Sequence, residues 1–163
     1  MNYVFALALG IGIVAGLRSL TAPAVVAWGA HLGWLNLHDS PLAFMGSTTA
    51  MAILSLLAIG ELIADKLPMT PKRTAPAPLI ARIITGGLCG ASLVAAVGKS
   101  LVAGMGKSLV AGILLGGIGG VVGAFLGYSV RRRLVNNFHI KDLVVAVSED
   151  AIAIGLALFL VSR

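Results

Sequence analysis

The amino-acid sequence predicts an all-α protein, a polytopic transmembrane helical bundle, and three observations lead to that prediction. Of the 163 residues, 58% are hydrophobic and only 11% are charged, with a mean hydropathy of +1.01, which leaves too few charges for the surface of a water-soluble domain. Apolar runs of about 20 residues, long enough to cross a bilayer as a helix, recur through the whole chain. These runs lack period-two alternation and the chain holds 21 glycines, which is typical of packed helices and not of outer-membrane strands. We therefore expect one integral-membrane domain over residues 1–163.

Five membrane-spanning helices are expected. Their approximate bounds are Tyr3–Leu20, Phe44–Lys66, Pro78–Gly98, Leu109–Val130 and Leu143–Ser162. Basic residues cluster after the second span and after the fourth: Lys66, Lys72, Arg73 and Arg82, then Arg131, Arg132, Arg133 and Lys141. By the positive-inside rule both basic loops face the cytoplasm, which places the C-terminus outside. The N-terminus lies inside if the first segment crosses once.

The first segment is expected to be broken or re-entrant. The chain stays apolar after Arg18, but Thr21–Pro23 carries a helix-start signal. We expect a break near Ser19–Thr21, followed by a short helix that lies at the outer interface or dips into it. If Ala22–Leu35 crosses the membrane instead, the N-terminus moves outside.

Four of the six acids fall in or at the edge of the expected spans, at a similar depth: Glu61, Asp65, Glu149 and Asp150. Helical spacing places Glu61 and Asp65 on one face of their span, and Asp150 on a stripe of small residues formed by Ala146, Ala153 and Ala157. A charged side chain near the middle of a bilayer costs on the order of 2.5 to 3.5 kcal/mol, so such groups turn inward, pair or take a proton. We therefore predict that the four acids bind an ion or a proton.

Arg18 is the expected counter-charge of these acids, because it is the one basic residue deep in an apolar run. The competing interpretation is that Arg18 neutralises one or two acids and only locks the bundle together.

The run Ser148-Glu149-Asp150 also matches a helix-start signature. A helix that began at Ser148 would keep only about fifteen residues, too few to cross a bilayer unbroken. The last span therefore either begins near Leu143 or is discontinuous.

Glycines recur at four-residue intervals, most clearly in the fourth span. One series is Gly112, Gly116 and Gly120, and the other is Gly119, Gly123 and Gly127. Small residues at this interval let helix backbones approach closely. The fourth span is thus expected to be central or to form a subunit contact, and self-association through the glycine faces is expected.

Two kinds of internal similarity are visible. A helix with Arg18 is followed by one with Glu61 and Asp65, just as Arg131–Arg133 at the end of the fourth span are followed by Glu149 and Asp150 in the fifth. This similarity suggests an inverted repeat. The segment GKSLVAG also occurs twice in succession, from Gly98 and from Gly106. Neither copy has the earlier glycine of a phosphate-binding loop, so we read the pair as a duplication that lengthens an extracytoplasmic turn.

Several classes of function are not expected. The net charge of +6 resides in short loops between apolar runs, which indicates orientation and not nucleic-acid binding. The three histidines lack metal spacing and the single Cys89 lies in an apolar segment, so no metal and no other cofactor are expected. Without a recognisable nucleophile and base, an enzyme is not expected either.

The motifs GIVAGLRSLTAP, GELIADKLP and SEDAIAIGLAL, in this order, resemble the bacterial membrane family described as domain of unknown function 4126. The likeness covers most of the chain. The resemblance implies a small integral inner-membrane protein and no established activity.

Together these features favour transport or conduction of a small solute or ion, with membrane lipids and a second copy of the chain as partners. The alternative is a non-transporting scaffold or lipid-interacting protein in which the buried charges are structural.

Overall fold

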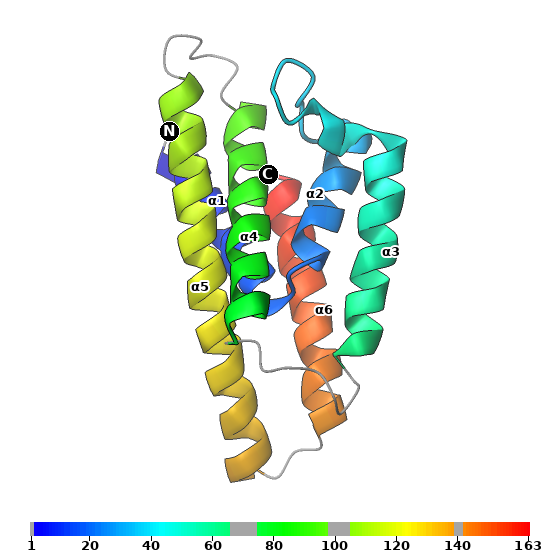
Figure 1. The fold of residues 1–163 in the computed structure, drawn as a ribbon, viewed down its shortest axis with the longest axis vertical. Coiled ribbons are helices and arrows are strands. Elements are labelled where there is room, and N and C mark those ends of the chain that lie inside the picture. The colour runs from blue at the N-terminus through cyan, green and yellow to red at the C-terminus, as the bar shows by residue number, and fades with distance from the viewer. Residues whose placement is uncertain (1, 66–74, 98–104, 139–141) are drawn as a thin grey trace.

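The computed structural model describes residues 2–65, 75–97, 105–138 and 142–163 (Figure 1). Within these ranges the chain is helical and contains no strand. The helices are α1 (Asn2–Leu17), α2 (Thr21–His31), the 3-10 helix η1 (Ala43–Gly46), α3 (Thr48–Ala64), α4 (Pro76–Val97), α5 (Met105–Phe138) and α6 (Asp142–Val161). The all-α prediction is confirmed.

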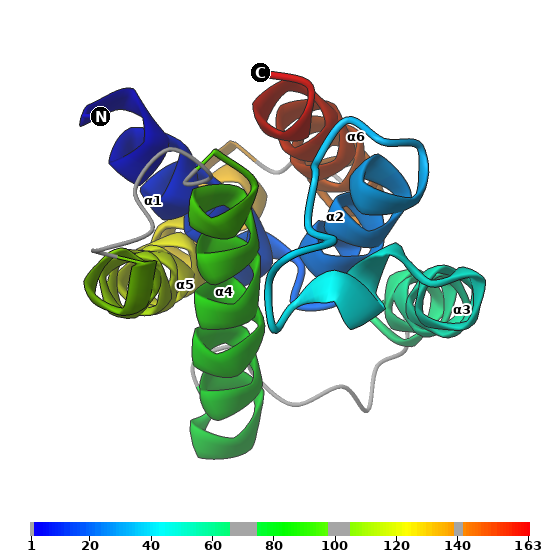
Figure 2. The same cartoon turned by 90° about the horizontal axis from the view of Figure 1, so that it is seen from above.

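The helices form two groups, seen side by side from above in Figure 2. Helices α1, α4 and α5 pack closely together, and α2 packs against α3 and α6. The apolar core, which includes Ile11, Val26 and Leu93, lies where the groups meet. Arg18, between α1 and α2, is therefore placed at the junction of the two groups.

Three helices are long and apolar enough to cross a membrane: Pro76–Val97, Ser108–Asn136 and Val144–Val161. Two shorter apolar helices, Tyr3–Leu17 and Thr48–Ala64, match the first two expected spans in position but fall below that length. The coarse prediction of an apolar helical bundle therefore holds, while five full spans are not established.

Helix α2 ends at a glycine with left-handed backbone. Gly33 has φ of +80°, a conformation that side chains with a Cβ rarely adopt, and the N–H of Trp34 donates to the carbonyl of Gly29 at 2.8 Å. The chain then turns into the connection that leads to α3, whose first turn is capped by the Ser47 hydroxyl accepting from the N–H of Ala50 at 3.1 Å.

The first segment is broken into two helices, α1 and α2. The break falls at Arg18–Leu20 as predicted, but α2 turns back beside α3 and α6. Leu20 lies next to Glu61 near the end of α3, and His31 contacts the Gly46 carbonyl before its start. Helix α2 therefore runs along the bundle beside α3 and α6, and its position relative to a bilayer stays a prediction.

The direction of α1 shows at which end of the bundle the N-terminus lies. Gly10 packs against Leu160, whereas Arg18 pairs with Asp150, so α1 runs antiparallel to α6. The N-terminus thus lies at the end of the bundle where α6 finishes, opposite the Arg131–Arg133 end. This direction brings Arg18 to its two carboxylates, because Asp65 lies at the C-terminal end of α3 and Asp150 lies in the first half of α6.

The predicted inverted repeat does not agree with the helix directions. Helices α1 and α5 run parallel, since Gly12 faces Gly116 and Gly16 faces Gly120. The corresponding members of an inverted repeat would run in opposite directions.

Helix α5 is central, as its glycines predict. A Cβ placed on Gly116 would lie 2.1 Å from the carbonyl oxygen of Gly86 in α4, and one on Gly123 would lie 2.1 Å from that of Ile13 in α1. Gly112 and Gly120 also face α4, and Gly119 faces α1. These faces are covered within the chain, which corrects the expectation that they make subunit contacts. Gly127 is buried and lines a groove between α5 and α6.

Helix α5 also begins earlier and ends later than expected. The second copy of the duplicated segment, from Gly106, is helical and belongs to α5 instead of to a turn. The first copy, residues 98–104, lies outside the described residues. At the other end the helix continues through the three arginines to Phe138, because the segment after Val130 contains no glycine or proline.

Candidate functional site

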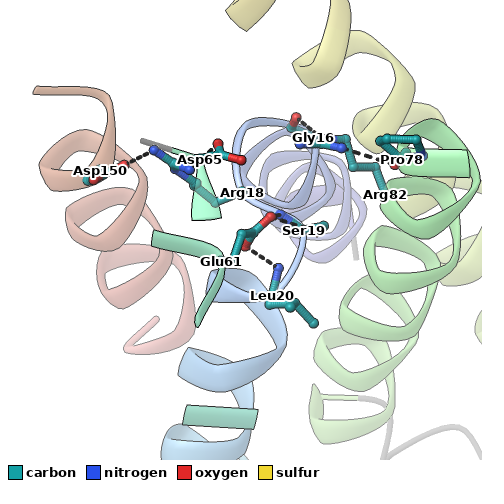
Figure 3. A network of polar contacts seen from close by, with 9 residues as sticks. All are labelled: Gly16, Arg18, Ser19, Leu20, Glu61, Asp65, Pro78, Arg82 and Asp150. Carbon is teal, nitrogen blue, oxygen red and sulfur yellow. Dashed lines mark hydrogen bonds and ion pairs between the residues drawn. The ribbon is translucent and has the colours of Figure 1, made fainter. Parts of the chain in front are cut away.

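Arg18 lies at the centre of a buried polar network at the break between α1 and α2 (Figure 3). Its side chain is fully buried; Nη1 donates to Asp65 Oδ2 and Nη2 donates to Asp150 Oδ1. Asp65 is the C-cap residue of α3, and Asp150 lies on the buried face of α6 with Ala146 and Ala153. One guanidinium therefore joins the break to two other helices.

Glu61 contacts the backbone of the break instead of Arg18. Its Oε1 accepts hydrogen bonds from the Ser19 N–H at 2.8 Å and the Ser19 hydroxyl at 2.7 Å, and its Oε2 accepts from the Leu20 N–H at 2.8 Å. The carboxylate thus lies at the N-terminal end of α2, where the helix dipole favours negative charge.

The sequence of α2 explains why a carboxylate from another helix is needed there. Leu20 is the N-cap residue and has no side chain that can accept a hydrogen bond from the first turn. Pro23 removes one backbone donor, since proline has no N–H. Glu61, reaching across from α3, satisfies the backbone donors just before the helix.

Arg82 interacts with the other side of the break. Its Nε donates to the carbonyl of Gly16 in the last turn of α1 at 3.0 Å, its Nη1 donates to the carbonyl of Pro78 at 3.0 Å, and the residue is 4% exposed. A cation at a helix C-terminus is favourable, so both helix ends at the break face a charge of opposite sign. Sequence reasoning assigned Arg82 to a basic loop, although its place inside an apolar span was a signal for a buried partner.

Glu149 lies apart from the network. It lines a groove with Leu17 and Arg131 between α1, α5 and α6, while its neighbour Asp150 points at Arg18. Adjacent helical positions differ by about 100° in direction, so the two acids could not share one site. The predicted cluster of four acids is therefore corrected to three: Glu61, Asp65 and Asp150.

The serine before Glu149 is not a helix cap. Ser148 donates its hydroxyl to the carbonyl of Val144 at 2.8 Å inside an unbroken α6. Of the two alternatives drawn from the sequence, the continuous span is the one observed.

Two buried polar atoms beside the break have no hydrogen-bond partner in the described part of the chain. They are Arg18 Nε and the hydroxyl oxygen of Thr21, the first residue of α2. Buried polar groups are almost always satisfied, so these two atoms are exceptions that lie three positions apart in the chain.

Among the described residues, no group of three or more His, Cys, Asp or Glu side chains is arranged to hold a metal ion. His31 and His38 are exposed, and His139 lies outside the described residues. Three pockets lined by described residues do not include Arg18, Glu61, Asp65 or Asp150 in their walls.

Fold and site together define a small, membrane-like helical protein with a buried charge network at a helix break. The chain belongs to the family described as Domain of unknown function (DUF4126), whose model matches residues 5–162. No curated protein and no solved structure is detectably similar to it.

Replacing Glu61 with glutamine is expected to lower the free energy of unfolding by about 1 kcal/mol, because the amide keeps one acceptor but loses the charge at the start of α2. The matched variant is Glu149→Gln, which removes the same charge outside the network and should cost less. Denaturant titration of the purified protein in lipid nanodiscs gives both values. Equal losses for the two variants would show that the contacts of Glu61 contribute nothing specific.

Proposed function

We propose that the protein transports or conducts a small ion or solute across a bacterial inner membrane, and that the break between α1 and α2 is its site. Asp65 and Asp150 bind the cation or coupling proton, Glu61 positions the start of α2, and Arg18 is the counter-charge. The single observation that carries the proposal is a discontinuous helix whose two ends meet buried charges beside Arg18. Half-helix ends of this kind form the binding sites of many secondary transporters.

The charges and the unpaired atoms of the network give further support. Its described members include three carboxylates and two guanidinium groups. The Thr21 hydroxyl and Arg18 Nε offer polar partners that the described residues leave unused. A small hydrated ion would bring water that supplies the missing hydrogen bonds.

The orientation in the membrane is part of the proposal. Arg131, Arg132 and Arg133 mark the cytoplasmic end of α5 by the positive-inside rule. Both termini then face outward, and α1 with α2 forms a re-entrant hairpin that enters from the outer side and breaks at the level of the acids. A homo-oligomer would form through outer faces such as those of Gly60 in α3 and Gly155 in α6, where a Cβ meets no atom within 4 Å.

A second function is favoured by a different observation. Arg18 is fully buried with both terminal nitrogens paired, which is also what a purely structural lock requires. In that case the protein is a scaffold or lipid-interacting protein, and no solute passes the break.

Flux measurements in proteoliposomes separate the two functions. The wild-type chain is expected to carry protons, alkali cations or a small anion, and Asp65→Asn to slow that flux at least about tenfold, the change that corresponds to about 1.4 kcal/mol of barrier. The control is Asp39→Asn, an exposed acid in the loop at the other end of the bundle, which should leave the flux unchanged.

A folded wild-type protein with no flux of any tested ion would contradict transport and leave the structural function. Equal slowing by Asp65→Asn and Asp39→Asn would contradict the assignment of the site.

A further inference from the structure

Two hollows on the surface of the bundle share one residue, Arg131. The first is a largely apolar groove of about 350 Å³ between α1, α5 and α6, whose walls include Leu17, Leu126 and Ile152. The second is a smaller hollow of about 210 Å³ on the last turns of α5, lined by Tyr128, Arg131, Arg132, Val135 and Asn136. Arg131 therefore lines both hollows, and Arg132 lines only the smaller one.

The position of Arg131 along α5 matches the edge of a bilayer. The residues from Ser108 to Val130 include no charged side chain. As a helix this stretch is about 35 Å long, close to the roughly 30 Å thickness of the hydrocarbon core. Arg131 is the first charge after it, and Tyr128 lies one turn earlier, at the level where aromatic rings meet headgroups. The part of the groove at Leu126 and Val130 therefore lies at the depth of acyl chains, and Arg131 and Arg132 lie at the depth of phosphates.

The side chains of the smaller hollow suit a phosphate diester. A guanidinium presents a planar pair of N–H donors that fits two phosphate oxygens, and both Arg131 and Arg132 line the hollow. The Asn136 amide and the Tyr128 hydroxyl add neutral donors. Arg131 and Arg132 line the smaller hollow and Glu149 lines only the adjoining groove, so the charged groups of the hollow favour a headgroup that is anionic overall.

We propose that this junction is a binding site for an anionic glycerophospholipid of the cytoplasmic leaflet, with the phosphate held by Arg131 and Arg132 and one acyl chain lying in the groove. The site rests on the membrane placement proposed above but not on transport. A lipid held there packs against Leu17, the residue before Arg18, and so contacts the last turn of α1 at the break.

Native mass spectrometry of the full chain, purified in detergent with equal amounts of phosphatidylglycerol and phosphatidylcholine, tests the site. The wild-type protein is expected to retain phosphatidylglycerol in preference. Arg132→Gln should weaken that retention about fivefold, the effect of removing one arginine near an anionic surface. The matched control is Arg163→Gln, which removes the same charge at the exposed C-terminus, where the arginine lies over the Phe159 ring, and should leave retention unchanged.

A second variant tests the groove without altering charge. Val130 is 53% exposed and lines the groove, so Val130→Trp fills it while leaving the fold's core intact, and it should also weaken retention. Equal retention of the two lipids by the wild type, or equal weakening by Arg132→Gln and Arg163→Gln, would overturn the site. Undiminished retention by Val130→Trp would overturn the placement of the acyl chain. Flux measured on the same preparation reports separately on the proposed function.

Discussion

Replacing Arg18 with methionine is expected to lower the free energy of unfolding by about 3 to 5 kcal/mol, the largest effect that we predict for a single substitution. Methionine keeps much of the apolar stem but removes the guanidinium. Asp65 and Asp150 then face each other without their shared cation, and each side chain is only 12% exposed. The cost arises chiefly from leaving two carboxylates buried without that guanidinium, and less from losing the attraction itself.

The measurement is unfolding in mixed micelles or nanodiscs, followed by circular dichroism. Arg163→Met serves as the control, since this exposed arginine lies over the Phe159 ring with its centre 4.4 Å from the ring centroid and outside any buried network. Arg163→Met should change stability little. A similar, small effect of both substitutions would mean that the ion pairs of Arg18 are not formed in the folded protein.

Replacing Gly116 with alanine is expected to cost about 2 to 3 kcal/mol, because the new methyl group has no room between the backbones of α4 and α5. Its carbon would lie 2.1 Å from the carbonyl oxygen of Gly86 and 3.1 Å from Cα of Gly90. Backbone atoms cannot move aside as the end of a flexible side chain can. The two helices must therefore separate, which also loosens the contact of Gly12 with α5.

The same substitution at Gly155 provides the control. A Cβ there meets no atom within 4 Å, and alanine is the better helix former, so Gly155→Ala should raise stability by about 0.5 to 1 kcal/mol. Thermal unfolding of both variants gives the comparison. Gly116→Ala with wild-type stability would contradict the close approach of the two backbones.

The part of the site that could be predicted from sequence follows from one physical rule. Arg18, Asp65 and Asp150 are charges in apolar surroundings, and such charges must find partners, so their convergence could be expected from the sequence alone. The stripe of Ala146, Ala153 and Ala157 correctly indicated that Asp150 faces inward. The close packing of α5 likewise followed from its glycine spacing.

The rest depended on three-dimensional features that no local pattern carries. That Glu61 caps α2 instead of pairing with Arg18 depends on the turn after Arg18, which brings two backbone N–H groups to the carboxylate. Glu149 lies outside the network because α6 is rotated so that Asp150, and not the adjacent Glu149, faces Arg18. The hairpin of α1 and α2 depends on where the partners of Arg18 lie, and those partners are 47 and 132 residues away along the chain.

The most direct test of the central claim, that Arg18 joins the helix break to α6 through Asp150, is a double-mutant cycle. It combines Arg18→Met with Asp150→Leu and measures the free energy of unfolding of the wild type, both single variants and the double variant. We predict a coupling energy of at least about 1.5 kcal/mol, as found for close, desolvated charge pairs. The double variant should therefore lose less stability than the two single variants lose together. A coupling energy near zero would mean that the two side chains do not interact, and it would contradict the network described for this break.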